Sequence, residues 1–146
     1  MEEIDRRIVS LLSRNGRMSF TELARQAGLS VSAVHQRVRR LETEGVITGY
    51  VALCDPAVIG LPLTAFVSIK PFDQSAADDV PERLKGLTAI EACHSVAGDE
   101  NYILKVRVAS PVALEDLLHQ IRSLAKVSTR TTVVLSTAFE NRPPEL

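Results

Sequence analysis

A short capped helix, a glycine turn and a second amphipathic helix follow one another over residues 19–45, and this pattern constrains the fold most. Ser19 stands three residues before Glu22, the spacing of a capping box at a helix start. Gly28 follows the apolar positions of this first helix, where a glycine most easily adopts the left-handed conformation that ends it. The next helix has its apolar face at Val34, Val38 and Leu41. The order predicts a helix-turn-helix.

The residues on either side extend this motif into a small domain. Residues 3–14 carry apolar side chains at helical spacing and stop at Asn15-Gly16, which predicts a preceding amphipathic helix. Residues 46–55 alternate and are rich in β-formers, so we expect a strand there, with a very short wing at Thr48-Gly49. We therefore expect a winged helix-turn-helix domain over residues 1–50, followed by a strand and linker over residues 51–62.

The second half of the chain has a different periodicity. We expect strands at 64–70, 89–97, 102–109 and 127–136, the middle two forming a hairpin. Helices are expected at 76–87, with the helix proper starting near Asp79, and from Ser110 to about Leu124. The order βαββαβ is that of a ferredoxin-like domain, here 63–140 with a flexible tail at 141–146. The fold class is α+β.

The charge of the chain is unevenly distributed. Its net charge is −1, but residues 1–50 hold eight Arg against six acidic residues, and three of these Arg fall within four positions. No apolar run approaches the ~20 residues of a membrane helix, and no signal-peptide core follows the acidic N-terminus. We expect a cytoplasmic protein with no membrane partner. Its two cysteines, Cys54 and Cys93, are expected to be free thiols.

The helix after Ser30 carries the candidate DNA contacts. At about 100° per residue, its polar stripe lies opposite its apolar face. Gln pairs bidentately with adenine and Arg with guanine in the major groove, while Ser and Arg also bind phosphates. The candidates are Ser30, Ser32, His35, Gln36, Arg37, Arg39 and Arg40. The alternative is an ordinary solvated face, and Arg37 is as well placed to form an ion pair between helices.

The expected hairpin turn is a candidate site for a small zwitterion. Gly98, Asp99, Glu100 and Asn101 bring backbone amides, carboxylates and an amide side chain together. Thr129 and Thr131, on one face of the last strand, are placed to supply hydroxyl groups to the same ligand. The alternatives are a plain polar turn and ordinary β-branched strand residues.

Catalytic and metal-binding patterns are missing from the sequence. Cys93 and His94 are neighbours on an expected strand and therefore point to opposite faces. No CxxC or HxxxH pair, Ser-His-Asp arrangement, P-loop or GxGxxG occurs. Acylphosphatase-type enzymes share the βαββαβ order but need an anion-cradling loop with Arg after the first strand, where this chain has residues 70–73, Lys-Pro-Phe-Asp. We expect no enzyme activity, no metal and no cofactor.

The chain resembles the Lrp/AsnC, or feast/famine, transcriptional regulators over essentially its full length. The resemblance rests on the run LSxSxVxxRVxxLExEGVIxGY, from Leu29 to Tyr50, and on EACHSVAGDENYILKVRV in the second domain. It implies a DNA-reading first domain and an amino-acid-sensing second domain. It also implies homodimers through paired sheets that assemble into octameric or similar discs, with the effector between dimers. The positions carried over for sensing are Gly98, Asp99, Asn101, Tyr102, Thr129 and Thr131.

One position departs from the family pattern. Many members have Asp where this chain has Asn101, which loses the charge that would pair with a ligand ammonium. Glu100 or Asp99 would then supply that charge, so neither leucine nor asparagine can be assumed as the effector. We expect a sequence-specific, double-stranded-DNA-binding regulator modulated by an amino acid or related molecule. The alternative is a DNA-compacting architectural protein with little ligand response.

Overall fold

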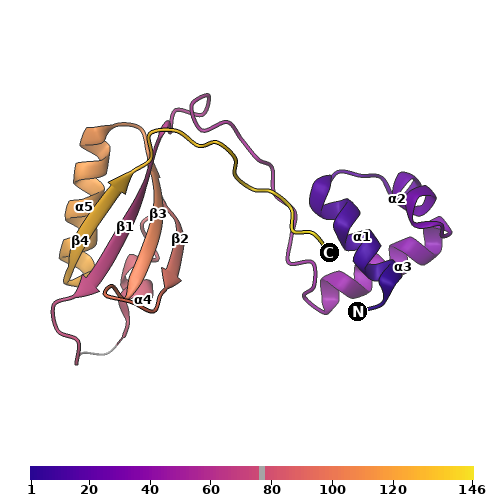
Figure 1. Cartoon of the computed structure of the whole chain (residues 1–146), viewed down its shortest axis with the longest axis horizontal. Helices are drawn as coiled ribbons and strands as arrows, with labels where there is room; N and C mark the ends of the chain where they lie inside the picture. The colour runs from indigo at the N-terminus through magenta and orange to yellow at the C-terminus, as the bar shows by residue number, and fades with distance from the viewer. Residues whose placement is uncertain (76–77) are drawn as a thin grey trace. The chain divides into compact units, whose positions relative to one another are not determined.

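The structure is a computed structural model that describes residues 1–75 and 78–146. Contacts between residues divide the chain into two units (Figure 1). The first comprises Met1–Leu53 together with Ala138–Leu146, and the second is Cys54–Thr137. Within the described residues, none of the helices combines the length and apolar character needed to cross a bilayer.

The first unit is a three-helix bundle around a small apolar core. Helix α1 spans Glu3–Arg14, α2 spans Phe20–Ala27 and α3 spans Val31–Thr43. Each contributes fully buried apolar side chains, among them Ile8, Leu23, Val34 and Leu41. The expected helix-turn-helix is therefore confirmed as α2, a turn and α3, with α1 packed against both.

Local hydrogen bonds set the ends of α2 and α3. The Ser19 hydroxyl accepts from the Glu22 amide at 3.1 Å, and Gly28 ends α2 at φ 71°. The Glu22 carboxylate binds the side chains of Arg25 and Gln26, which lower its pKa to about 2. Ser30 is the N-cap of α3, accepting from the Ala33 amide at 3.2 Å. These caps fix the turn that sets α3 against α2.

The strand expected over residues 46–55 does not form. After α3, the amides of Val46 and Ile47 both donate to the Leu41 carbonyl, at 2.9 and 3.0 Å, which closes the helix end. Beyond that point the backbone of 48–55 is not in a strand, and Val51 and Leu53 are 86% and 71% exposed. A strand needs a hydrogen-bonding neighbour, and no other part of the described chain offers one to this segment.

The second unit has the predicted order βαββαβ. Its elements are β1 Leu63–Pro71, α4 Val80–Leu84, β2 Ile90–Ser95, β3 Tyr102–Val108, α5 Pro111–Ala125 and β4 Val127–Val133. The strands form one antiparallel sheet in the order β2-β3-β1-β4. Near one end of the sheet, Ile69 of β1 is level with both Tyr102 of β3 and Thr129 of β4. The α+β class and the ferredoxin-like order are confirmed.

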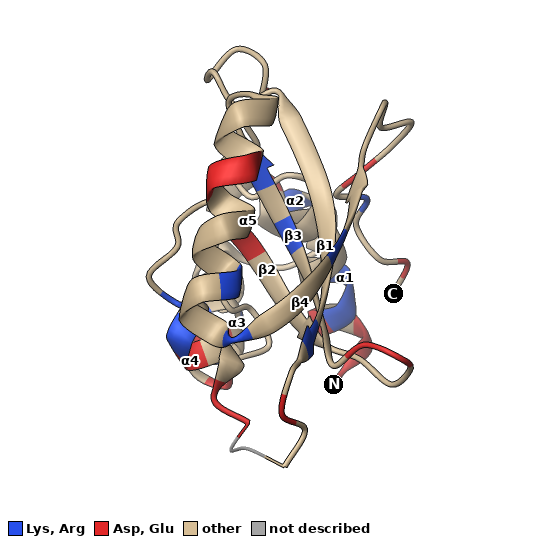
Figure 2. Cartoon of the chain, turned by 90° about the vertical axis from the view of Figure 1, so that its left-hand side faces the viewer, with Lys and Arg blue, Asp and Glu red and all other residues tan. Residues whose placement is uncertain are grey.

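Strand alternation gives the sheet one apolar and one mixed face. Val67, Leu104 and Val127 lie on the face covered by α4 and α5, where they pack with Leu117 and Ile121 of α5. The opposite face carries Lys105 and Arg107, both of which contact Glu91. Figure 2 shows α5 along the sheet and basic residues on β3 and β4. The hairpin between β2 and β3 lies at the sheet end marked by Ile69.

Three elements of this unit are markedly shorter than expected, among them the strand predicted over 89–97, which is observed as Ile90–Ser95. The helix predicted over 76–87 is observed only as Val80–Leu84, with Asp79 as its N-cap; residues 76–77 lie outside the described chain. The strand predicted over 127–136 ends at Val133, which pairs with Ala65. One more amide, that of Val134, donates to Thr64, and β1 itself begins at Leu63, so the ladder has no further partner.

Candidate functional site

Helix α3 presents a polar stripe on the side away from its buried residues. Ser32, Gln36 and Arg39 are exposed, one or two turns apart. His35 is also exposed and packs edge-on against Phe20 of α2, with ring centroids 5.0 Å apart. Ser30 uses its hydroxyl as the N-cap acceptor while remaining exposed. An amide, hydroxyls and a guanidinium along one accessible face are the groups that contact base edges and phosphates.

Arg37 and Arg40 turn toward α1 instead. Nη1 of Arg37 donates to Oδ1 of Asp5 at 2.9 Å and to Oε2 of Glu2 at 2.8 Å. Nη2 of Arg40 donates to Oδ2 of Asp5 at 2.6 Å. The hydrogen bond to Glu2, which is the larger cause, and the one to Asp5 raise the pKa of Arg37 above its ordinary value. The structure thus brings Arg37 and Arg40 into the ion pair between helices that the sequence left open for Arg37.

Arg39 differs from its two neighbours. Within the described part of the chain, no carboxylate forms an ion pair with it. It lies on the exposed face with Gln36 and one turn from Thr43, whose hydroxyl donates to the Arg39 carbonyl at 2.8 Å. Of the three clustered arginines of α3, Arg39 is therefore the one whose guanidinium faces solvent without a described acidic partner.

A depression of about 420 Å³ lies beside the β2–β3 hairpin. Five predicted residues, Gly98, Asp99, Glu100, Asn101 and Tyr102, all line it. Four further polar residues line it that were not predicted from the sequence: Lys70, Gln74, Asp78 and Ser95. Their only signal in the sequence is position, because β1, β2 and the start of α4 all meet at this end of the sheet. A concave surface that gathers both signs of charge suits a small polar ligand.

Two polar contacts anchor the hairpin. The Tyr102 hydroxyl donates to Oδ1 of Asp78 at 2.7 Å, and the Tyr102 side chain is otherwise buried. The Glu100 carboxylate forms an ion pair with Arg130 of β4. Asp99 is exposed and, among the residues described, forms no ion pair. It is the carboxylate at the hairpin that remains open to a ligand.

Thr129 and Thr131 do not line this depression. They lie on the α5 side of β4, level with Ile69 and Val67 of β1, so β1 lies between them and the hairpin strand β3. The Thr129 hydroxyl accepts from Arg122 of α5 at 3.2 Å. Within one chain, the hairpin and the two threonines are therefore not gathered around a single cavity.

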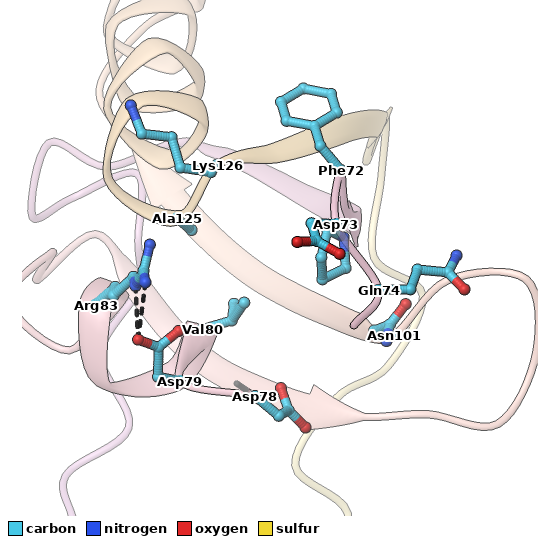
Figure 3. Close-up of a pocket in the computed structure, with 11 residues that line it drawn as sticks. Phe72, Asp73, Gln74, Asp78, Asp79, Val80, Arg83, Asn101, Ala125 and Lys126 are labelled. Carbon is cyan, nitrogen blue, oxygen red and sulfur yellow. Dashed lines mark hydrogen bonds and ion pairs between the residues drawn. The ribbon is translucent and has the colours of Figure 1, made fainter. Parts of the chain in front are cut away.

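A second depression, of about 390 Å³, adjoins the first (Figure 3). The two share Gln74, Asp78 and Asn101. The second continues past Asp79, which pairs with Arg83 at 2.9 Å, to Lys126 at the end of α5. The hairpin thus borders a polar surface that runs around this end of the sheet.

The chain matches known proteins in both halves. Residues 1–48 match a winged helix-turn-helix DNA-binding family, and residues 64–144 match the Lrp/AsnC ligand binding domain. The HTH-type transcriptional regulator LrpA of Mycobacterium tuberculosis is 52% identical over 142 residues, covering 97% of this chain and 95% of that protein. The leucine-responsive regulatory protein of Escherichia coli is 39% identical over 141 residues, covering 92% and 85%. A solved feast or famine regulatory protein from M. tuberculosis, complexed with L-methionine, has a TM-score of 0.96 at 52% identity, covering 98% and 97%.

Both tyrosines should ionise late in an alkaline titration. The hydrogen bond to Asp78 and burial raise the pKa of Tyr102 to about 12, and partial burial and the bond to Glu42 do the same for Tyr50. Both pKa values lie above that of a tyrosine in the unfolded chain. The contribution of the two tyrosines to folding stability is therefore complete below pH ~10. It is lost as the pH rises through about 12.

The chain has two Tyr and no Trp, so near-ultraviolet absorbance reports tyrosinate directly. The folded protein should show little tyrosinate at pH ~10, where the denatured chain is half ionised. Tyr102→Phe should remove one of the two late steps and leave that of Tyr50. A full ionisation step near the ordinary value in the folded protein would contradict these hydrogen bonds.

Proposed function

The chain belongs to the Lrp/AsnC family of transcriptional regulators, and on that premise we propose that it binds double-stranded DNA through α3 and adjusts this binding to an amino acid held at the β2–β3 hairpin. The observation that carries the proposal is the capped α2–turn–α3 motif with its exposed polar stripe. In this proposal residues 1–50 are the DNA-binding domain and 63–140 the effector-binding and assembly domain, joined by 51–62. The protein would act in the cytoplasm, on genomic DNA.

The stripe assigns different tasks to its members. Gln36 and Arg39 are the candidates for base edges, because an amide pairs bidentately with adenine and a guanidinium with guanine. Ser30 and Ser32, at the start of α3, are candidates for phosphate contacts, supported by the positive end of the helix dipole. His35 borders them beside Phe20. Arg37 and Arg40 instead serve the contact between α3 and α1.

A two-fold dimer supplies the affinity that one short helix lacks. One α3 reads only a few base pairs, whereas two on a dimer would meet half-sites about one DNA turn, ~34 Å, apart on an imperfect palindrome. The sheet face opposite α4 and α5 supports such pairing, because Phe66 on it is 42% exposed. Further association of dimers into an octamer or a similar disc would add binding sites by avidity.

The effector proposal rests on the charges at the hairpin. An amino acid carries an ammonium and a carboxylate at fixed separation. Asp99 is placed to bind the ammonium, and Lys70, in the same depression, to bind the carboxylate. Asn101 supplies a neutral donor and acceptor between them. Since the depression is lined mainly by polar groups, the apolar contacts that select a side chain would come from a neighbouring copy.

Selection of genomic DNA on the purified protein at ~0.15 M salt tests the proposal, because non-specific binding is weak there. The retained fragments would be sequenced with and without a mixture of the twenty amino acids. We expect a few upstream regions that share an imperfect inverted repeat, with retention altered by the mixture. Even retention across the genome, indifferent to amino acids, would instead support an architectural DNA-compacting protein.

Arg39→Ala should weaken binding to a selected site and reduce discrimination at one base pair by ~1–3 kcal/mol. Arg39→Lys is the matched variant, because lysine keeps the charge but cannot form the bidentate pair. It should retain affinity for mixed-sequence DNA and still lose discrimination. Titrations against the site and its single-base variants measure both quantities. Unchanged discrimination in Arg39→Ala would remove this residue from the base contacts.

Asp99→Ala should abolish the amino-acid response and leave DNA binding without effector intact, because the lost carboxylate belongs to the second unit. Calorimetric titration with a panel of amino acids measures the loss of binding heat. Asp116→Ala is the control: it removes an exposed aspartate of α5 that lies outside the hairpin depression. Wild-type heats for Asp99→Ala would exclude this carboxylate from the effector site.

A further inference from the structure

We propose that Asp5 is a specificity-determining residue of the DNA-binding unit, whose buried carboxylate withholds the guanidinium groups of Arg37 and Arg40 from DNA phosphates. This inference rests on the proposed DNA binding by α3. It adds that a residue of α1, outside the helix-turn-helix, sets how much of the charge of α3 is available for sequence-independent attraction.

The geometry gives each carboxylate oxygen of Asp5 its own guanidinium. Oδ1 accepts from Arg37 at 2.9 Å and Oδ2 from Arg40 at 2.6 Å. The two arginines stand three residues apart on α3, so their side chains reach one point on α1 together. Asp5 is the one buried charged residue described in the chain, and its side chain is 3% exposed.

Two further acids complete the cluster at its exposed rim. Glu2 holds Arg37 at 2.8 Å and is 61% exposed, while Glu44 approaches Nε of Arg40 at 3.9 Å. Two guanidinium groups therefore face three carboxylates, and the cluster carries a formal charge of −1. Of the clustered arginines Arg37, Arg39 and Arg40, only Arg39 therefore has no acidic partner among the described residues.

Because Asp5 is buried, it retains Arg37 and Arg40 more strongly than an exposed acidic residue would. If Arg37 and Arg40 turned to phosphates, the Asp5 carboxylate would be left charged, buried and unpaired, which is strongly unfavourable. An exposed acid such as Glu2 is hydrated when it loses its partner, so it adds a smaller, still measurable contribution to the binding of Arg37. Phosphates therefore compete poorly for these two arginines.

The consequence for DNA binding is measurable. Each additional phosphate contact steepens the fall of log K with log salt by about 0.9 on duplex DNA, whatever the sequence. Releasing Arg37 and Arg40 would add up to two such contacts. On mixed-sequence DNA the protein is free to shift until both released arginines meet phosphates, whereas base contacts hold it in one register on the selected site. Affinity for mixed-sequence DNA would then rise more than affinity for the selected site, and the ratio between them would fall.

Glu2→Gln and Glu3→Gln form a matched pair at the start of α1. Each removes one negative charge from an exposed glutamate, but only Glu2 holds a guanidinium of α3 within the described chain. Binding of the full-length protein to a selected fragment and to mixed-sequence duplex DNA would be titrated between ~50 and 200 mM salt. Because Arg37 keeps its bond to Asp5 in Glu2→Gln, this variant should steepen the salt slope on mixed-sequence DNA by only a measurable fraction of the ~0.9 of one full phosphate contact. Glu3→Gln should leave the slope unchanged.

Asp5→Asn is the stronger variant. It should steepen the same slope by up to about 1.8 and reduce the preference for the selected site several-fold. A role in stability alone would lower the melting temperature without changing the slope. If the variant does not fold, the glutamate pair still decides, because both of those positions are exposed.

Different failures point to different errors. Equal salt slopes for Glu2→Gln, Glu3→Gln and wild type, with site preference intact, would overturn the proposed role of this cluster and leave the proposed DNA binding standing. A loss of affinity confined to the selected site in Asp5→Asn would show that Asp5 orients the two arginines toward bases, which also overturns the proposal. If the wild-type protein bound no DNA, the proposed function itself would be wrong, and this inference with it.

Discussion

The buried carboxylate of Asp5 is the contact on which the use of α3 depends. It ties α1 to α3 through two guanidinium groups, and so it fixes which face of α3 lies against the bundle. The small apolar core around Ile8, Leu23 and Leu41 supplies the burial, but apolar contacts alone tolerate rotation and sliding between helices. Two directional hydrogen bonds to one buried carboxylate restrict the orientation of α3 against α1 more narrowly. The remaining stripe of α3, with Gln36 and Arg39, is then the surface left for recognition.

Most of the elements could be predicted from the sequence because their signals are local. The caps at Ser19 and Ser30 and the left-handed turn at Gly28 involve residues within four positions of one another, and helical spacing identifies Val34, Val38 and Leu41. The segment 46–55 has an equally clear β pattern, yet no strand forms, since a pattern cannot specify a hydrogen-bonding neighbour. The shortened β4 follows the same logic, because its length is set by where β1 begins.

The candidate sites were harder to predict, because partner choice is a tertiary property. From its position in the sequence, Arg37 had two open roles, and only the position of Asp5, thirty-two residues away, places its guanidinium in an ion pair. At the hairpin, sequence order grouped Gly98–Asn101 correctly around one depression. It could not show that Tyr102 is turned to Asp78 or that Glu100 is bound to Arg130, which leaves Asp99 as the open carboxylate. Thr129 and Thr131 share a strand face with the core, and β1 lies between them and the hairpin strand β3.

The division of the chain into two units limits how an effector can act on DNA binding. The hairpin belongs to the unit Cys54–Thr137 and α3 to the unit that contains Met1–Leu53. A small ligand at Asp99 would bind residues of one unit, whereas the Asp5 cluster that sets which arginines α3 presents lies within the other. Such a ligand can shift DNA binding only through a different affinity for alternative arrangements of units or copies. The charge of α3 would then be a fixed property of the monomer, set by Asp5, while the spacing of two such helices would be the quantity that an amino acid controls. Low sequence-independent affinity favours this separation of roles, because a change in spacing matters most when each α3 alone binds weakly.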